Sequence, residues 1–222
     1  MIALLAALEG EMAGLRRQMA LAPEGIAGLD GSAYTGLYRG RPVLLAWTGM
    51  GRQRARAGAE AVLAHGPVSV VVSIGFSGAL EESLAGGDLV LASSLIGVKD
   101  THGHEVQPAL YPPDPERLRA AAQALGETPL RVVQGPTVTA PGLIATPDCK
   151  RDLGRRTGAV AVDMESYWVA AVAAERGLPF LALRVISDAQ REPLPPLTRS
   201  RMRTAPQACA SWFPTCSGAP AA

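Results

Sequence analysis

Residues 159–188, AVAVDMESYWVAAVAAERGLPFLALRVISD, decide the fold class. The first four residues are small or β-branched, which favours a strand that ends near Asp163. A helix then begins around Glu165 and is closed by Gly177. Residues 178–188 form a second apolar run and predict another buried strand. A strand, a helix and a further strand in direct succession are typical of α/β proteins.

The same alternation of strands and helices runs through the rest of the chain. Strands are predicted at 1–8, 68–80 and 87–98, with two strands within 32–51 and a strand, a turn and a short strand within 130–146. Helical spacing is present at 9–20, 52–66, 117–126 and 149–158. The proline-rich residues 100–117 predict a surface loop. No linker or repeat divides the chain, so we expect one α/β domain with a mostly parallel or mixed sheet.

Composition limits the classes of function. The 222 residues are 18% charged and carry a formal net charge of +1, so there is no electrostatic basis for binding nucleic acid or a membrane surface. Three cysteines, an odd number without CxxC spacing, fit free thiols in a reducing compartment. The first residues lack a basic segment before their apolar run, and no run reaches the length of a membrane span. We therefore expect a cytoplasmic protein without nucleic-acid or membrane partners.

Polar residues collect at the ends of the predicted strands. In open α/β sheets ligands bind beyond the carboxyl ends of the strands, so these residues are the candidate site. The strand ends lead to Glu9 and Glu11, to Thr48, Met50 and Gly51, to Gly75, Ser77 and Gly78, to Asp163 and Glu165, and to Arg184, Ser187 and Asp188. Acidic residues are favoured at helix N-termini whatever their role, and Asp163 and Glu165 can be explained in that way alone.

Three carboxylates near one arginine nevertheless favour a chemical role. Glu11, Glu165 and Asp188 would meet Arg184 at the same edge of the sheet. In cleavage of a glycosidic bond, the oxocarbenium-like transition state needs negative charge near the sugar, the leaving group needs an acid, and water needs a base. A metal-dependent hydrolase could use the same residues.

Five segments carry a resemblance to a known family. ALEGEM (7–12), TGMG (48–51), GFSGAL (75–80), VDMES (162–166) and RVISD (184–188), in this order, resemble the purine nucleoside phosphorylase/uridine phosphorylase superfamily. The most similar branch is the 5′-methylthioadenosine/S-adenosylhomocysteine nucleosidases. The resemblance covers residues 1–190 and implies a single-domain, three-layer α/β sandwich around a twisted mixed sheet, assembled as a homodimer. It does not extend to residues 191–222, where we expect an atypical helix or a loose tail in place of the family's long final helix.

The activity implied by the resemblance is hydrolysis of the N-glycosidic bond of a 5′-modified adenine nucleoside, with no cofactor or metal. Glu11 corresponds to the acid that activates water, and Glu165 to the carboxylate that binds the ribose and stabilises the cationic sugar. Asp188 corresponds to the acid that protonates the purine at N7. Because adenine leaves poorly before that protonation, we expect Asp188 to be partly buried where its protonated form is favoured, and Glu165 to stay ionised.

The substrate-binding residues are likewise implied by the resemblance. Met164 packs beside Glu165, Ser187 positions Asp188, Arg184 lies near the water and Glu165, and Leu143 with Ile144 lies around the base. The complete set is Met50, Phe76, Ser77, Gly78, Leu143, Ile144, Met164, Arg184 and Ser187.

Departures from the family pattern keep other functions open. Phe76 stands where the nucleosidases have a small polar residue, and Leu143 replaces an aromatic residue. Residues 178–196 also resemble phosphorylase-like proteins of hopanoid biosynthesis, and futalosine hydrolases are a related branch. Phosphorolysis would use arginines such as Arg16, Arg17 and Arg52 to hold phosphate. A non-catalytic nucleoside-binding protein of the same fold is the third alternative.

The histidines give a weaker signal. His102 and His104 form an HxH pair, but the pair lies in a proline- and glycine-rich loop without matched Cys or Asp spacing. We therefore interpret both as surface residues and expect no metal site.

Overall fold

A computed structural model describes residues 1–101 and 113–194. In these residues the strands are β1 (Ile2–Ala6), β2 (Ala22–Glu24), β3 (Ala33–Tyr38), β4 (Arg41–Trp47), β5 (Val70–Ala79), β6 (Leu89–Gly97), β7 (Val132–Thr139), β8 (Ala161–Asp163) and β9 (Phe180–Asp188). The helices are α1 (Glu9–Met19), α2 (Arg52–His65), α3 (Pro115–Gly126), α4 (Pro147–Thr157) and α5 (Ser166–Glu175).

The strands form one mixed sheet in the order β2-β3-β4-β1-β5-β8-β7-β6-β9. Strand β5 also pairs with β9, so β5, β8, β7, β6 and β9 close into a ring. Strand β5 is parallel to β1 and β9 and antiparallel to β8. It therefore lies at the centre of the fold and brings residues from both halves of the chain together. The single-domain, mixed-sheet α/β fold expected from the sequence is confirmed.

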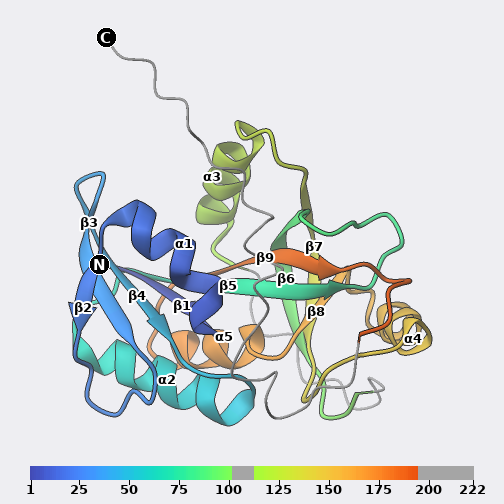
Figure 1. The fold of residues 1–222 in the computed structure, drawn as a ribbon, viewed down its shortest axis with the longest axis horizontal. Helices are drawn as coiled ribbons and strands as arrows, with labels where there is room; N and C mark the ends of the chain where they lie inside the picture. The colour runs from blue at the N-terminus through green and yellow to red at the C-terminus, as the bar shows by residue number, and fades with distance from the viewer. Residues whose placement is uncertain (102–112, 195–222) are drawn as a thin grey trace.

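Both faces of the sheet around β1 are covered, which gives three layers. Ala3 and Leu5 pack in a cluster with the apolar residues of α2 and α5, whereas Leu4 and Ala6 pack with those of α1. This is the alternation of a strand buried on both faces. Figure 1 shows α2 and α5 on one side of these strands and α1 on the other.

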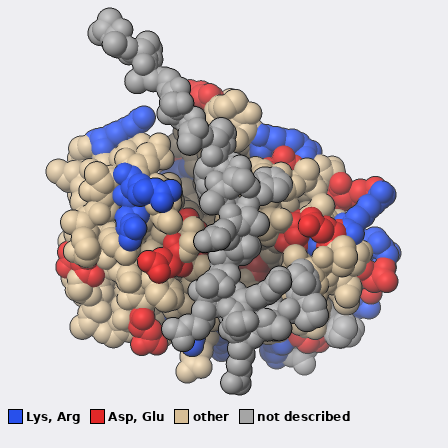
Figure 2. Space-filling model, in the orientation of Figure 1, with Lys and Arg blue, Asp and Glu red and all other residues tan. Residues whose placement is uncertain are grey.

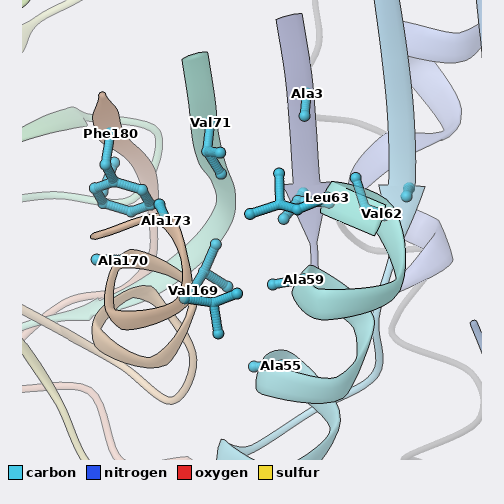
Figure 3. Packing of buried hydrophobic residues seen from close by; sticks show 14 of the residues in the cluster. Ala3, Ala55, Ala59, Val62, Leu63, Val71, Val169, Ala170, Ala173 and Phe180 are labelled. Carbon is cyan, nitrogen blue, oxygen red and sulfur yellow. The ribbon is translucent and has the colours of Figure 1, made fainter. Parts of the chain in front are cut away.

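Small residues bring α2 and α5 close together. Ala55 and Ala59 of α2 are fully buried, as are Ala170 and Ala173 of α5. Ala59 points toward Val169 of α5 in the packed interior (Figure 3). Side chains of this size let two helices approach each other and the sheet at the same time. Helix α5 is thereby fixed at its N-terminal end, where Glu165 lies.

The structure differs from the sequence-based prediction at several element boundaries. Strand β2 has no counterpart among the predicted elements; it contains Pro23, which cannot donate to a ladder, but it is an edge strand, where proline is tolerated. The short strand predicted after β7 does not form, because the chain turns at Pro141 and Gly142. Helices α3 and α4 begin earlier than predicted, each with proline in its first turn behind a capping side chain, Asp114 or Thr146.

Part of the chain lies outside the described residues, including His102, His104 and the predicted tail beyond residue 194. Within the described part, no helix is both long and apolar enough to cross a bilayer. The face in Figure 2 carries Lys and Arg interspersed with Asp and Glu, without a broad area of one sign.

Candidate active site

Strands β5 and β9 bring two of the candidate residues to one region of the sheet. Their parallel register places Gly75 opposite Arg184 and Gly78 opposite Asp188, with an irregularity between Ser77 and Gly78. Gly75 and Gly78 are three residues apart, which corresponds to about 10 Å along the strand. Arg184 is 1% exposed and Asp188 is 3% exposed. Two buried charged groups therefore lie on β9, four residues apart.

Glu11 joins this region from the start of α1. Its Oε2 accepts from the N–H groups of Ala7 and Leu8, at 3.0 and 2.8 Å, and its Oε1 accepts from Phe76 N–H at 2.8 Å. Helix N-termini are commonly capped by a glutamate at the third helical position whose side chain accepts from the N-cap N–H. Burial raises the pKa of Glu11, although the Phe76 N–H and the Arg184 guanidinium oppose this shift.

Gly75 leaves the space in which Glu11 and Arg184 approach each other. A Cβ atom at this position would lie 2.6 Å from Arg184 Nη1 and 2.6 Å from Glu11 Oε1. The φ angle of Gly75 is +148°, which also disfavours other residues. Gly75, the first glycine of GFSGAL, is therefore required because two functional side chains approach the backbone closely at this position.

Glu165 is the N-cap residue of α5, and its carboxylate turns toward the glycine-rich loop before α2. Its Oε1 accepts from Gly51 N–H at 2.7 Å. Burial, with a smaller contribution from the Asp163 carboxylate, raises the pKa of Glu165 from its ordinary 4.5 to about 7. A raised pKa makes the charge of Glu165 sensitive to its surroundings near neutral pH, and the expectation that Glu165 is ionised beneath the ribose cation stays a prediction.

Asp163 has a structural role. Its Oδ1 accepts from the N–H groups of Glu165 and Ser166, both at 3.2 Å, and from Thr139 Oγ1 at 2.6 Å. Its Oδ2 lies 2.9 Å from Arg184 Nε in an ion pair that is almost fully buried. Asp163 thus orders the start of α5 and holds the arginine, while Glu165 keeps its carboxylate for the site.

Arg184 is held on several sides. Besides Asp163, it donates to Ser73 Oγ at 2.5 Å and to Ser166 Oγ at 2.5 and 3.0 Å. Its Nη1 lies beside Gly75 and Glu11. Its positive charge favours the ionised forms of both Glu11 and Glu165. The structure therefore places Arg184 where it acts on two of the three carboxylates.

The raised pKa of Glu165 predicts how stability depends on pH. The folded state binds this proton more tightly than the unfolded chain, so its favourable contribution is complete below about pH 4.5 and is lost as pH rises to about 7. For one buried carboxyl the loss amounts to about 3 kcal/mol. We expect Glu165→Gln to gain stability relative to wild type by this amount between pH 5 and pH 8, as measured by urea unfolding. If the difference in unfolding free energy between the variant and wild type is the same from pH 5 to pH 8, the pKa of Glu165 is not raised in the folded state.

Asp188 meets a partner that the sequence did not reveal. Ser187 Oγ donates to Asp188 Oδ1 at 2.6 Å, as expected, and Lys150 Nζ lies 2.5 Å from Asp188 Oδ2. A Cβ atom at Gly78 would lie 2.9 Å from the same Oδ2, so glycine is needed there too. Asp188 is buried, and the expectation that it acts as the acid stays a prediction.

The other predicted substrate-binding residues differ in their surroundings. Met50 and Met164 are half-buried neighbours of Gly51 and Glu165 in the chain. Phe76 provides the N–H that binds Glu11, and Ser77 is buried, with its carbonyl accepting from Ser187 Oγ at 3.2 Å. Leu143 is 37% exposed, whereas Ile144 is buried in an apolar cluster with residues of α4, β7 and β8. The assignment of Leu143 and Ile144 to the base stays a prediction.

Sequence reasoning missed Lys150 and the partners of Arg184. Lys150 is one of only two lysines in a chain with 21 lysine and arginine residues. In a chain that otherwise uses arginine, this rarity marks Lys150 as a candidate for a specific role. The serines at 73 and 166 gave no such signal, because an isolated serine in a strand or in a first helical turn is common in any fold.

A cavity near these elements is not the site of the carboxylates. A surface groove of about 410 Å³ is lined by residues of α4 and of the turns after β5 and β9, including Glu82, Arg151 and Arg155. These three side chains are exposed and form ion pairs with Arg191, Asp148 and Asp152. Buried charges with shifted pKa values mark functional sites better than exposed, paired ones, so we assign the site to the carboxylates. Among the described residues, Glu11, Glu165 and Asp188 included, no three His, Cys, Asp or Glu side chains converge as metal ligands would.

Comparisons with known proteins agree with this fold. A 5′-methylthioadenosine/S-adenosylhomocysteine nucleosidase of Listeria monocytogenes is 29% identical over 200 residues, which cover 84% of this chain and 85% of the relative. The structure of such a nucleosidase from Neisseria meningitidis, in complex with methylthio-immucillin-A, superposes with a TM-score of 0.76 at 24% identity, covering 86% and 87% of the two chains. A futalosine hydrolase mutant of Helicobacter pylori gives a TM-score of 0.75 at 22% identity over 86% of each chain. The profile of the phosphorylase superfamily matches residues 1–210, and the chain therefore belongs to that superfamily.

Proposed function

We propose that this protein is a nucleosidase that hydrolyses the N-glycosidic bond of a 5′-modified adenine nucleoside and releases adenine. The observation that carries the proposal is the geometry around β5 and β9. Two carboxylates with raised pKa values, Glu11 and Glu165, lie near Arg184, and a third, Asp188, lies further along the same strands. The activity named for the Listeria and Neisseria relatives supports the substrate class.

The three carboxylates divide the reaction between them. Glu165 in its ionised form stabilises the positive charge that develops on the ribose. Glu11 accepts a proton from the attacking water, and Asp188 in its protonated form gives its proton to purine N7 as the bond from C1′ to N9 breaks. The bonding electrons leave with adenine, water oxygen bonds to C1′, and the water proton ends on Glu11. The separation of about 10 Å between Gly75 and Gly78 is suited to a sugar at one end and a base at the other.

The charges around Glu11 favour water over phosphate as the nucleophile. A phosphate anion at this position would face the carboxylates of Glu11 and Glu165, and like charges repel strongly when desolvated. Two of the three arginines considered for phosphate have other contacts: Arg16 donates to Tyr34 Oη at 2.9 Å, and Arg52 stacks over Trp168 at 4.4 Å from the ring centroid. Arg184 is bound by Asp163 and two serines.

The direct test is adenine release from 5′-methylthioadenosine, S-adenosylhomocysteine and adenosine, compared at equal concentrations. We expect release from the 5′-modified nucleosides. Release only from futalosine-type or adenosyl-lipid substrates would move the protein to one of those branches. Tight binding of adenine nucleosides without any release would show a non-catalytic binder.

Gly75→Ala tests the contact between Glu11 and Arg184. The added methyl would displace both groups, and a displacement of about 1 Å in a catalytic constellation lowers turnover on the order of 10²-fold. The control is Gly14→Ala in α1, where nothing lies within 4 Å of the new methyl. Initial rates of adenine release measure the effect. Equal rates in both variants would contradict the proposed role of Gly75.

The domain boundaries, the oligomeric state and the cellular compartment are also part of the proposal. We infer that residues 1–190 form the catalytic domain, that 191–222 is an atypical appendage, and that the protein acts as a homodimer in the cytoplasm. The half-buried free thiol of Cys149 supports a reducing compartment. Light scattering behind size-exclusion chromatography tests the dimer, and a monomer mass at working concentration would contradict it.

A further inference from the structure

Lys150 is a buried lysine that the reaction described above does not use. It lies on α4, its side chain is fully buried, and its ammonium makes three contacts. Nζ lies 2.5 Å from Asp188 Oδ2 and donates to the carbonyl oxygens of Ala189 and Glu192, at 2.8 and 2.7 Å. Two of the three ammonium donors are used on carbonyl oxygens, and the contact with Oδ2 is an ion pair. A fully buried ammonium carries a large desolvation cost, which makes such a position unusual without a purpose.

We propose that Lys150 is the positioning residue for leaving-group protonation, because it fixes which oxygen of Asp188 meets the purine. The inference rests on the proposed function. Lys150 holds Oδ2, Ser187 donates to Oδ1 at 2.6 Å, and the carboxylate is thereby fixed at both ends. Oδ1 accepts one hydrogen bond from Ser187, so its other lone-pair position is the one that carries the proton given to the N7 edge of the base.

The surroundings show why the chemistry needs this cation. The Ala189 and Glu192 carbonyls are within hydrogen-bond reach of Nζ, and therefore lie beside Asp188 as well. Without Lys150, the carbonyl oxygens of Ala189 and Glu192 would be unpaired acceptors that compete with purine N7 for the proton of Asp188. A carboxyl that donates to its own backbone is no acid for the substrate.

Other charged groups in the described structure do not replace this contact. Glu192 directs its carboxylate to Ala189 N–H at 3.3 Å, and the adjacent Arg151 is exposed and pairs with Asp148. Gln190 donates to the carbonyl of Leu80. The ion pair of Lys150 and Asp188 therefore involves no competing carboxylate from these neighbours.

Lys150 also connects Asp188 to the predicted base-binding segment. Its two carbonyl contacts hold the chain just after β9, and Leu194 N–H donates to the carbonyl of Ala145 at 2.9 Å. Ala145 follows Leu143 and Ile144 directly. The lysine thus ties the acid to the segment predicted to line the base.

Lys150→Met tests the inference with two substrates that share a sugar. We expect adenine release from 5′-methylthioadenosine to fall about 10²-fold in kcat, within the range that one general acid supplies. Hydrolysis of the p-nitrophenyl glycoside of 5-methylthioribose is expected to stay within about threefold of wild type, because nitrophenolate leaves without a proton. Lys150→Arg keeps a cation and donors and is expected to recover part of the adenine rate.

The matched control is Arg155→Met, which removes an exposed cation from the same helix. It is expected to leave both rates unchanged. Equal losses on both substrates in a folded Lys150→Met protein would show a merely structural role and overturn the inference, as would an unchanged adenine rate. If Lys150→Met does not fold, the same two rates are measured in Lys150→Arg, where a larger loss with adenine than with nitrophenol is expected and equal losses would overturn the inference.

A second readout separates this inference from the proposed function. Wild type that releases no adenine contradicts the nucleosidase, but binding of free adenine, measured by calorimetry, still reports on Asp188. We expect Lys150→Met or Lys150→Arg to weaken adenine binding about tenfold, or about 1.4 kcal/mol, because Asp188 is then no longer held toward the base. Unchanged adenine affinity would overturn the role of Lys150 whatever the nucleoside assay shows.

Discussion

Asp188→Asn is expected to lower adenine release about 10²–10⁴-fold, the range supplied by one general acid. An amide cannot supply an acidic proton to N7, and it leaves the Lys150 ammonium, 2.5 Å away, without its counter-charge. Ser187 keeps an acceptor in the amide oxygen, so the local hydrogen bond at 2.6 Å can survive. The loss is expected in kcat more than in KM, because the interaction forms as the leaving group departs.

The control for this substitution is Asp88→Asn, at the residue directly before β6. Asp88 is also buried and pairs with Arg131 at 2.5 Å, so both variants lose an ion pair, although Arg131 is half-exposed and Lys150 is fully buried. Asp88→Asn is expected to cost stability without a specific loss of turnover. If Asp188→Asn retains wild-type kcat, Asp188 is not the acid.

Glu165→Gln is expected to lower kcat about 10²–10³-fold, as loss of one preorganised electrostatic group does. The amide oxygen can still accept from Gly51 N–H, now at 2.7 Å, so the loop before α2 keeps its anchor. What disappears is the negative charge beneath the developing cation. Because the substrate itself is uncharged, KM is expected to change much less than kcat.

The pH profile of this variant gives a second, independent result. In wild type, kcat/KM is expected to rise with pH up to about 7, since Glu165 must lose its proton before it can stabilise the sugar. Glu165→Gln is expected to lose this part of the acid limb and to keep only the part due to Glu11. Glu175→Gln, at the exposed end of α5, is the control. An identical acid limb in Glu165→Gln would refute the assignment.

The catalytic candidates were accessible from sequence because they lie at element boundaries. The β-branched run before Asp163 sets the end of β8, and α5 begins with Glu165 as its N-cap. This settles why two carboxylates stand two residues apart: Asp163 binds backbone N–H groups and Arg184, while Glu165 faces Gly51. Local propensity carries such information because it acts over a few residues.

The partners of these residues were not accessible in the same way. Lys150 and Asp188 come together only because α4 packs under the end of β9, and no local pattern specifies that contact. The pKa of Glu165 depends likewise on burial and on the Asp163 carboxylate, which no local pattern specifies. Charges and proton affinities are set by tertiary packing, whereas strand ends and helix starts are set locally.

The central claim is that water is the nucleophile in the cleavage of a 5′-modified adenine nucleoside. It is tested most directly by mass analysis of the sugar formed from 5′-methylthioadenosine in ¹⁸O-water, with and without inorganic phosphate. We predict free methylthioribose that carries one ¹⁸O atom at C1, formed at the same rate in both conditions. Methylthioribose 1-phosphate, formed only when phosphate is present, would contradict the account and remove the role of Glu11 as a base.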